Sequence, residues 1–282
     1  MSESDALYAE LDKRWKATCM VLLNEEVGGL ADYEEWLSSQ GQRTSFRKSR
    51  NGKTVSFFLP HYARGAGIIS YEDVDFNRKF EPLCINEVKD LDSIIEAVSE
   101  RISYAGNVVL GTSQHVEQST DVVDSFYVKN SAQVWGCKYV AYSFAMSHGE
   151  SLFGVTYCGH FKFCIASHSG DYLSRCFMTD NTYESSDCHY CFGLAGAKNC
   201  MFSFNLQGAS YRIGNLQLPP DKYNSLKAKL LSEIAGTLRK EKKLPSIFEL
   251  AAGHEPDRSV IDAMKKAKKV QLSDFRSDTA EL

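Results

Sequence analysis

The sequence predicts a mainly β protein with some α structure: a β-solenoid of about twelve residues per coil, flanked by an N-terminal α/β unit and C-terminal helices. Apolar or small residues recur at every third position over residues 107–217, and these triplets fall into columns that repeat every twelve residues. Self-similarity at a fixed period is typical of stacked repeats, in which each unit buries its inner face against its neighbours. We therefore divide the chain into 1–106, 107–217, 218–254 and 255–282.

The bulk composition is that of an ordinary globular protein. The chain has 282 residues, of which 43% are hydrophobic and 24% charged, and its formal net charge is −4. This charge gives no global argument for a nucleic-acid or membrane partner. The first residues are polar and acidic, unlike a signal peptide, and no stretch approaches the roughly 20 apolar residues of a membrane span. Nine cysteines without an export signal predict a cytoplasmic protein with free thiols or metal ligands.

The first hundred residues predict a compact mixed α/β unit. Apolar residues at helical spacing predict a helix over residues 4–17, before the apolar run at 19–23, and "GGLADYEEWLSSQG" predicts a short second helix. Asn51-Gly52 lies between two strand-like runs, which indicates a hairpin with a two-residue turn. Residues 88–103 predict a further amphipathic helix.

The repeat region predicts a coiled chain with a narrow interior. One column holds, at twelve-residue steps, Val116, Val128, Val140, Leu152, Cys164, Cys176, Cys188, Cys200 and Arg212. Because a strand alternates sides every two residues, an inward residue at every third position requires one bend in each triplet. A coil of eighteen residues, as in left-handed hexapeptide-repeat folds, is the competing interpretation. We favour twelve because that period keeps four cysteines in line.

The repeat fades at "RIGNLQLPPDKY", and helical spacing resumes from Asp221 to about Lys240, followed by a short helix at "SIFELA". Solenoid ends expose unpaired backbone and apolar core. We therefore expect the α/β unit and the C-terminal helix to cover the two ends as lids. Beyond residue 254 the sequence predicts a terminal helix with a basic cluster and a polar tail; the cluster comprises Lys265, Lys266, Lys268 and Lys269.

The cysteines of "SSDCHYCFGLAGAKNC" have three interpretations. Cys176, Cys188, Cys191 and Cys200 supply the four thiolates that tetrahedral zinc would need. Alternatively, an oxidant could link neighbouring thiols as disulfides. In the third interpretation they fill inward positions, where a free thiol behaves as a small apolar group. We favour packing because the columns predict each of these cysteines, so no cofactor is predicted and zinc stays an alternative.

The end of the repeat resembles a known group of sequences. The motifs "SSDCHYC", "KNCMFSFNL" and "YRIGN", with Tyr223 after them, lie within residues 185–223. This segment resembles the end of a family of uncharacterised cysteine-rich repeat proteins from uncultivated bacteria and archaea. The triplet spacing is also similar to the twelve-residue coils of certain insect antifreeze β-helices. The outward threonine ladders that ice binding requires are missing, and neither resemblance implies an established activity.

The outward positions also form ladders. At twelve-residue steps one of them contains His148, His160, Tyr172 and Glu184. Two imidazoles with a phenol and a carboxylate could bind a metal or shuttle protons, so these are the candidate catalytic residues. The structural alternative is a mixed polar surface. A neighbouring ladder of Lys138, Glu150 and Lys162 predicts alternating charge pairing.

The predicted hairpin is locally basic. Between Trp36 and Tyr71 there is no acidic residue, and the basic side chains are Arg43, Arg47, Lys48, Arg50, Lys53 and Arg64. Phenylalanines interleave with them, which suits phosphate contacts and base stacking. The alternative is a solvated strand edge that its charges protect from aggregation.

Three functional hypotheses follow. The sequence contains no Walker loop, no Gly-x-Ser-x-Gly elbow and no His-Glu-x-x-His motif. We favour a non-catalytic β-solenoid scaffold that presents a ladder surface to a protein partner or larger assembly. The second hypothesis is a solenoid-type acyl or group transferase, with its site between the subunits of a homo-oligomer. The third is a nucleic-acid accessory protein that uses the basic hairpin.

Overall fold

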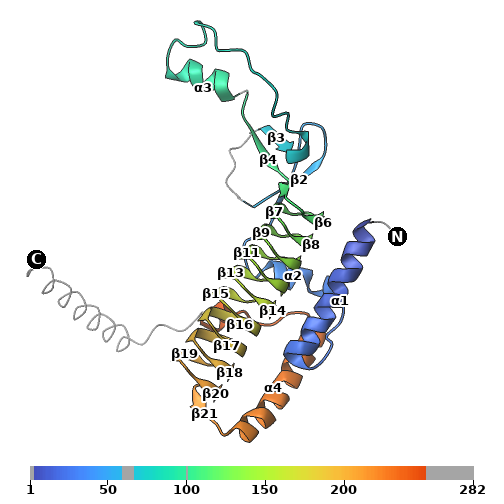
Figure 1. Ribbon diagram of the computed structural model, residues 1–282, viewed down its shortest axis with the longest axis vertical. Helices are drawn as coiled ribbons and strands as arrows, with labels where there is room; N and C mark the ends of the chain where they lie inside the picture. The colour runs from blue at the N-terminus through green and yellow to red at the C-terminus, as the bar shows by residue number, and fades with distance from the viewer. Residues whose placement is uncertain (1–2, 59–66, 100, 252–282) are drawn as a thin grey trace, which may run out of the picture. The chain divides into compact units, whose positions relative to one another are not determined.

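The computed structural model describes residues 3–58, 67–99 and 101–251, and the chain up to Ile247 belongs to one compact unit (Figure 1). Arg64, the basic cluster at 265–269 and the expected terminal helix at 255–282 lie outside the described residues. The helices are α1 (Glu3–Leu23), η1 (Leu30–Tyr33), α2 (Glu34–Ser38), η2 (Tyr71–Asp73), α3 (Leu91–Ser99), α4 (Pro220–Glu241) and α5 (Ile247–Ala251).

The strands begin with four that precede the coils: β1 (Ser45–Lys48), β2 (Thr54–Phe57), β3 (Gly67–Ser70) and β4 (Ser103–Gly106). The coils contain β5 (Val109–Leu110), β6 (Gln114–Glu117), β7 (Thr120–Val123), β8 (Phe126–Lys129), β9 (Ala132–Trp135), β10 (Lys138–Ala141), β11 (Phe144–Ser147), β12 (Glu150–Phe153), β13 (Thr156–Gly159), β14 (Lys162–Ile165), β15 (His168–Asp171), β16 (Ser174–Tyr183), β17 (Ser186–Ala195), β18 (Lys198–Met201), β19 (Phe204–Gln207), β20 (Ser210–Ile213) and β21 (Leu216–Gln217).

The coils are stacked in parallel with a twelve-residue register. Val140 lies opposite Val128 in the coil before it and opposite Leu152 in the coil after it. The same step pairs Cys164 with Cys176 and Cys188 with Cys200. The predicted twelve-residue β-solenoid is therefore confirmed, and the eighteen-residue alternative is wrong. Figure 1 shows the strands rising as a regular stack.

The backbone bends through left-handed residues. Every third residue from His115 to Gly214 has a positive φ, which gives four such positions in each twelve-residue coil. Each lies immediately before an inward-facing residue of the predicted columns. The predicted single bend per triplet is thus a left-handed residue. Most of these positions hold side chains other than glycine, and that conformation costs a residue with a Cβ about 1 kcal/mol.

The interior is held by side-chain hydrogen bonds that run from coil to coil. The hydroxyl of Ser131 donates to the Lys129 carbonyl (2.8 Å) and accepts from the Ser143 backbone N–H (3.1 Å). The Cys137 thiol makes the same two contacts, donating to Trp135 O and accepting from Gly149 N at 3.3 Å each. Serine and cysteine therefore satisfy the same buried backbone groups in successive coils, which explains how they alternate in the columns.

Helices cover one lateral side of the coils rather than the two ends. α1 contacts β6, β8, β10, β12, β14 and β16, and α4 packs against both α1 and β20. The Trp15 ring meets Phe153 edge-on at 5.4 Å, and Tyr223 of α4 is fully buried. The apolar run at residues 19–23 continues α1 instead of leaving it. The expected lids at the two ends are therefore wrong. The helices instead shield from water an outward column of large apolar residues that runs along the coils and includes Phe153, Ile165, Phe177 and Met201.

The strands before the coils form a small separate core. β1 and β2 make the predicted antiparallel hairpin, although its loop is longer than two residues, since Ser49 N–H donates to Lys53 O. Val55, Phe57 and Ile68 pack together apart from the other clusters. Asn107 joins this core to the first coil, because its amide oxygen accepts from Ser56 N–H at 2.8 Å.

The expected helix at 88–103 is the shorter α3, and its apolar stripe is not buried. Leu91 is 71% exposed and Ile95 is 56% exposed. The expected compact α/β unit is therefore divided: α1 and α2 pack on the coils, while α3 packs into none of the three buried clusters of the described chain. Within the residues that the structure describes, no helix has both the length and the apolar character to cross a bilayer.

A matched pair of alanines tests the left-handed bends. Ala145 has φ 55° and is half-buried, whereas the half-buried Ala195 is not among the positive-φ residues. We expect Ala145→Gly to raise the free energy of unfolding by about 1 kcal/mol, because glycine adopts this conformation without a Cβ clash. Ala195→Gly should lower it by about 0.5–1 kcal/mol. Urea unfolding measures both, and a loss of stability in Ala145→Gly would contradict the bend.

A buried histidine makes stability depend on pH. His189 lies between the coils and α1, and its Nε2–H donates to Leu22 O at 2.9 Å. Burial, with Lys227 nearby, lowers the pKa of His189 to about 4, and burial does the same for His168.

We expect these two histidines to contribute fully to the free energy of unfolding above pH 6.5. Their contribution should fall as the pH drops towards 4, because in this window the histidines bind protons more readily in the unfolded chain than in the folded one. Each histidine contributes a slope of up to about 1.4 kcal/mol per pH unit. His189→Phe should flatten the dependence by about half, leaving the part due to His168. Urea unfolding at pH 7.5, 6 and 5 measures this, and equal slopes in both proteins would refute the assignment.

Candidate functional site

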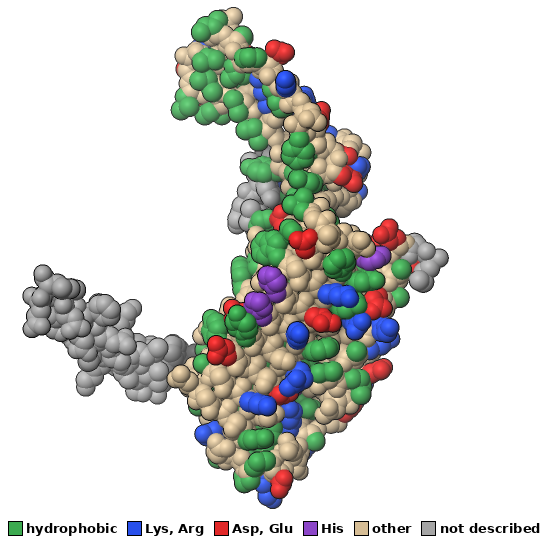
Figure 2. All heavy atoms as spheres, viewed as in Figure 1, with side chains coloured by type: hydrophobic (Ala, Val, Ile, Leu, Met, Phe, Trp, Pro, Cys, Tyr) green, Lys and Arg blue, Asp and Glu red, His purple; other side chains and the backbone are tan. Residues whose placement is uncertain are grey.

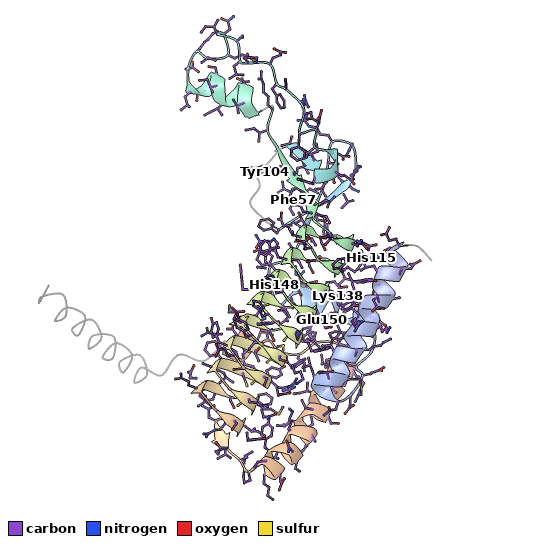
Figure 3. The ribbon with its side chains drawn as sticks, in the orientation of Figure 1. Phe57, Tyr104, His115, Lys138, His148 and Glu150 are labelled. Atoms are coloured by element: carbon purple, nitrogen blue, oxygen red, sulfur yellow. The ribbon has the colours of Figure 1, made fainter. Side chains whose placement is uncertain are left out.

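One side of the coils is uncovered by the described helices. It contains the outward column that the sequence singled out, and His148, His160, Tyr172 and Glu184 are all exposed there. Figure 3 shows His148 on the side of the coils away from α1, and Figure 2 shows histidines side by side on the surface. We call His148, His160 and Tyr172 the ring ladder.

The ring ladder is a stack of parallel rings. The centroids of His148 and His160 are 5.2 Å apart with planes 10° from parallel, and those of His160 and Tyr172 are 4.7 Å apart at 3°. All three residues have positive φ, so the left-handed bends set the rings at the coil spacing. Gly136 precedes the stack, and a Cβ there would lie 3.3 Å from the His148 ring. Glu184 continues the column without a ring.

The column beside the ring ladder is polar at its centre and aromatic at its ends. Gly159 lies between Ser147 and Asp171, and a Cβ on it would meet an Asp171 carboxylate oxygen at 2.6 Å. Trp135 and Tyr183 occupy the same column on either side, 42% and 45% exposed. The open side therefore presents a shallow polar centre between large rings. Such a surface suits contact with a macromolecule.

The stacking restricts the chemistry of the imidazoles. Lone pairs of a histidine lie in its ring plane, so parallel rings one coil apart do not direct two nitrogens at one ion. Across the described chain, no three His, Cys, Asp or Glu side chains are grouped so that they could hold a metal. Proton transfer by His148, His160, Tyr172 or Glu184 stays a prediction.

The charged ladder is aligned as expected but pairs differently. Lys138 lies opposite Glu150, and Glu150 lies opposite Lys162, in successive coils (Figure 3). No ion pair forms among these three described residues; the Lys138 ammonium instead lies 4.9 Å from the Tyr139 ring centroid. The coil-to-coil ion pairs form at other columns, Arg175 with Asp187 (2.7 Å) and Lys129 with Glu117 (3.3 Å). The predicted charge pairing is therefore wrong for this ladder.

The repeat cysteines are buried and unpaired by disulfides. Cys176, Cys188 and Cys200 follow one another in one inner column, and Cys191 lies opposite Thr179 in the next. Burial raises the pKa of Cys191. A hydrogen bond with Cys188 and the nearby Arg212 lower the pKa of Cys200 to about 7, although burial opposes this. Zinc binding by these thiols stays a prediction.

The basic hairpin meets acidic residues that the local sequence does not contain. Lys53 forms ion pairs of 2.7 Å with both Glu72 and Asp73. Arg43 lines a hollow of about 580 Å³, whose wall also carries Asp32, Glu34 and Glu35. Arg47 and Lys48 belong to β1, and Arg50 follows this strand. Polyanion binding stays a prediction that the charge distribution weakens.

The sequence reasoning missed the aromatic residues of the open side. Trp135 and Tyr183 are 42% and 45% exposed and lie in the column next to the ring ladder, while Tyr157 is 57% exposed and lies one outward column further away. A signal was present, because the twelve-residue grid assigns all three to outward positions. Neither a scan against protein-family models nor a search of the curated proteins finds a match for this chain. The site is therefore interpreted from its own geometry.

Thiol accessibility tests the placement of the cysteines. Cys84 is exposed, whereas the other eight are buried. We expect an aromatic disulfide reagent to react with one thiol in the native protein and with nine after unfolding, because burial excludes the reagent. Cys84→Ser should abolish the native reaction. Fast reaction of a second thiol in that variant would contradict the inner column.

Proposed function

We propose that the protein is a non-catalytic binding scaffold and that the open side of its solenoid contacts a protein partner. The observation that carries this proposal is the ring ladder, three parallel rings that stay exposed while the opposite side is covered by α1 and α4. Exposed aromatic side chains on a rigid surface are enriched at protein interfaces.

Rigidity supports the same proposal. Each ring is fixed by a bend in a coil that is hydrogen-bonded above and below, as when His148 N–H donates to Trp135 O at 2.8 Å and His160 N–H to Ser147 O at 2.9 Å. A surface that is ordered before binding loses little conformational entropy when a partner binds. The imidazoles of His148 and His160 are exposed on this surface, which makes them accessible to a partner protein.

The test is affinity capture from an extract of the native host. The variant His148→Ala/His160→Ala/Tyr172→Ala removes the ring ladder and leaves the inner columns unchanged. We expect proteins retained by the wild-type chain to fall at least fivefold with this variant, because aromatic anchors carry most interface energy. Quantitative mass spectrometry of the eluates measures the loss.

Lys162→Ala/Lys198→Ala is the matched control, since both lysines are exposed, lie on the coils and belong to a different column. It should retain the same proteins within twofold. Equal retention by the wild-type and ring-ladder variants would contradict the proposal. Turnover by the purified protein that requires His148 or His160 would contradict its non-catalytic part.

A further inference from the structure

The first coil has an edge that the later coils lack. β6 pairs with β8 alone, whereas β8 pairs with both β6 and β10. The chain before β6 does not complete a preceding coil, because β4 leaves the stack and pairs with β3. Within the described ranges, one edge of Gln114–Glu117 is therefore open. An open strand edge presents backbone donors and acceptors to another chain.

A backbone donor beside this edge has no backbone partner within the described part of the chain. At the equivalent corner of later coils, Asn130 N–H donates to Glu117 O and Tyr142 N–H to Lys129 O, each at 3.1 Å. The corresponding donor of the first coil is Gln118 N–H, and it makes no such bond to any residue that the structure describes. Gln118 is exposed, so the donor faces solvent rather than an apolar interior.

Two hollows adjoin this edge. One, of about 520 Å³, is lined by Gln118 and Ser119 on the coil side and by Thr54 and Tyr71 on the other. The second, of about 440 Å³, includes Gln114 and His115. Val109 and Val116 line both hollows. The hollows therefore adjoin along β6, and we call them together the edge groove.

The floor of the edge groove is the end of the solenoid core. Val116 heads the inner column of Val128 and Val140, but it is only partly buried, while both of its successors are fully buried. Val109 is 37% exposed at the same end. A chain lying along β6 would cover Val116 with a side chain of its own, as each coil does for the next.

The rim of the groove is net acidic. Glu72 lines the first hollow, where it and the neighbouring Asp73 share the single ammonium of Lys53. Glu3 lines the second hollow, and its side chain is 82% exposed. Among the residues that the structure describes, no lysine or arginine lines either hollow. These carboxylates favour a basic segment, since opposite charges across an interface assist association and fix its register.

We propose that the edge groove binds an extended basic segment of a partner protein, which adds to β6 as a parallel strand. Its backbone would accept from Gln118 N–H, and a small apolar side chain would pack on Val116. This is β-strand addition, in which main-chain bonds give affinity and alternate side-chain positions give specificity. The site is distinct from the ring ladder and does not depend on it.

The far end of the solenoid explains why the occupant is not a second copy in head-to-tail stacking. There β21 pairs antiparallel with β20. The Asn215 side chain accepts from Phe204 N–H and donates to Phe204 O, at 2.9 Å each, and so covers the edge of β19. The last coil offers no free parallel edge comparable with that of β6, so head-to-tail copies would not match.

The test uses the full chain and a synthetic peptide as the probe. The peptide SFYVKNSA copies residues 125–132, which carry a lysine and pair with the other edge of β6. In parallel register its valine would cover Val116 and its second serine would cover Ser119. We expect a dissociation constant below about 1 mM by fluorescence anisotropy. Gln118 N–H should become protected from hydrogen exchange.

Matched controls separate strand addition from non-specific adhesion. The same peptide N-methylated on alternate residues keeps its charge but loses backbone donors, and it should bind at least tenfold more weakly. Val109→Arg places a cation in the wall shared by both hollows and should weaken binding at least tenfold. Leu216→Arg, at a residue 64% exposed in the far end, should change it by less than twofold.

Three results would overturn the proposal. The first is no peptide binding at millimolar concentration, and the second is equal binding of the N-methylated peptide. The third is a wild-type dimer in sedimentation that Val109→Arg dissociates, because that would assign the edge to a second copy. Since the ring-ladder variant should bind the peptide as the wild-type chain does, failure here is distinguishable from failure of the proposed scaffold surface.

Discussion

A closed coil of only twelve residues depends on a left-handed residue in every triplet, and the rest of the structure follows from this constraint. Each such residue other than glycine is unfavourable by about 1 kcal/mol on its own. What offsets the cost is the stack, because every coil hydrogen-bonds to two neighbours and buries its inner residues against theirs. The conformation is therefore stable only collectively. The same residues point outward, and this is why His148, His160 and Tyr172 form a regular stack.

The narrow interior explains the cysteines without a cofactor. An inward residue must be small or of moderate size, and it must also satisfy backbone groups that the tight bends leave unpaired. Serine meets both requirements, and Cys137 shows that a thiol makes the same two contacts as Ser131. Arg212 ends the column because the last coil opens, and its guanidinium donates to Asn215 O at 3.0 Å. The Cys-x-x-Cys of Cys188 and Cys191 spans two adjacent inner columns.

The sequence could predict the features that depend on the twelve-residue period. It identified the register, the inner column and the neighbours on the ring ladder, because a triplet repeat leaves one inward position in three. It could not predict where α1 would pack, since Leu11 and Trp15 reveal only that one face of a helix needs cover. Contacts between distant segments were also beyond it: Lys53 is neutralised by Glu72 and Asp73, which lie about twenty residues away. The edge of β6 is open because β4 pairs with β3 instead of with β6. No local pattern in Ser103–Gly106 indicates which of these strands β4 pairs with.

The left-handed residues recur at every third position from His115 to Gly214 without interruption. This regularity limits which insertions and deletions the coils can accommodate. Inserting or deleting one residue would move every later side chain out of its column, exchanging inward for outward positions through the rest of the stack. A change of three would restore the bends but shift each column onto a different side. Only the insertion or deletion of a whole coil of twelve residues preserves both the positions of the bends and the side on which each column lies. The repeat can therefore grow or shrink by duplicating or losing complete coils. A one-residue offset occurs at its first coil, where Val109 lies opposite Val122, thirteen residues further along the chain.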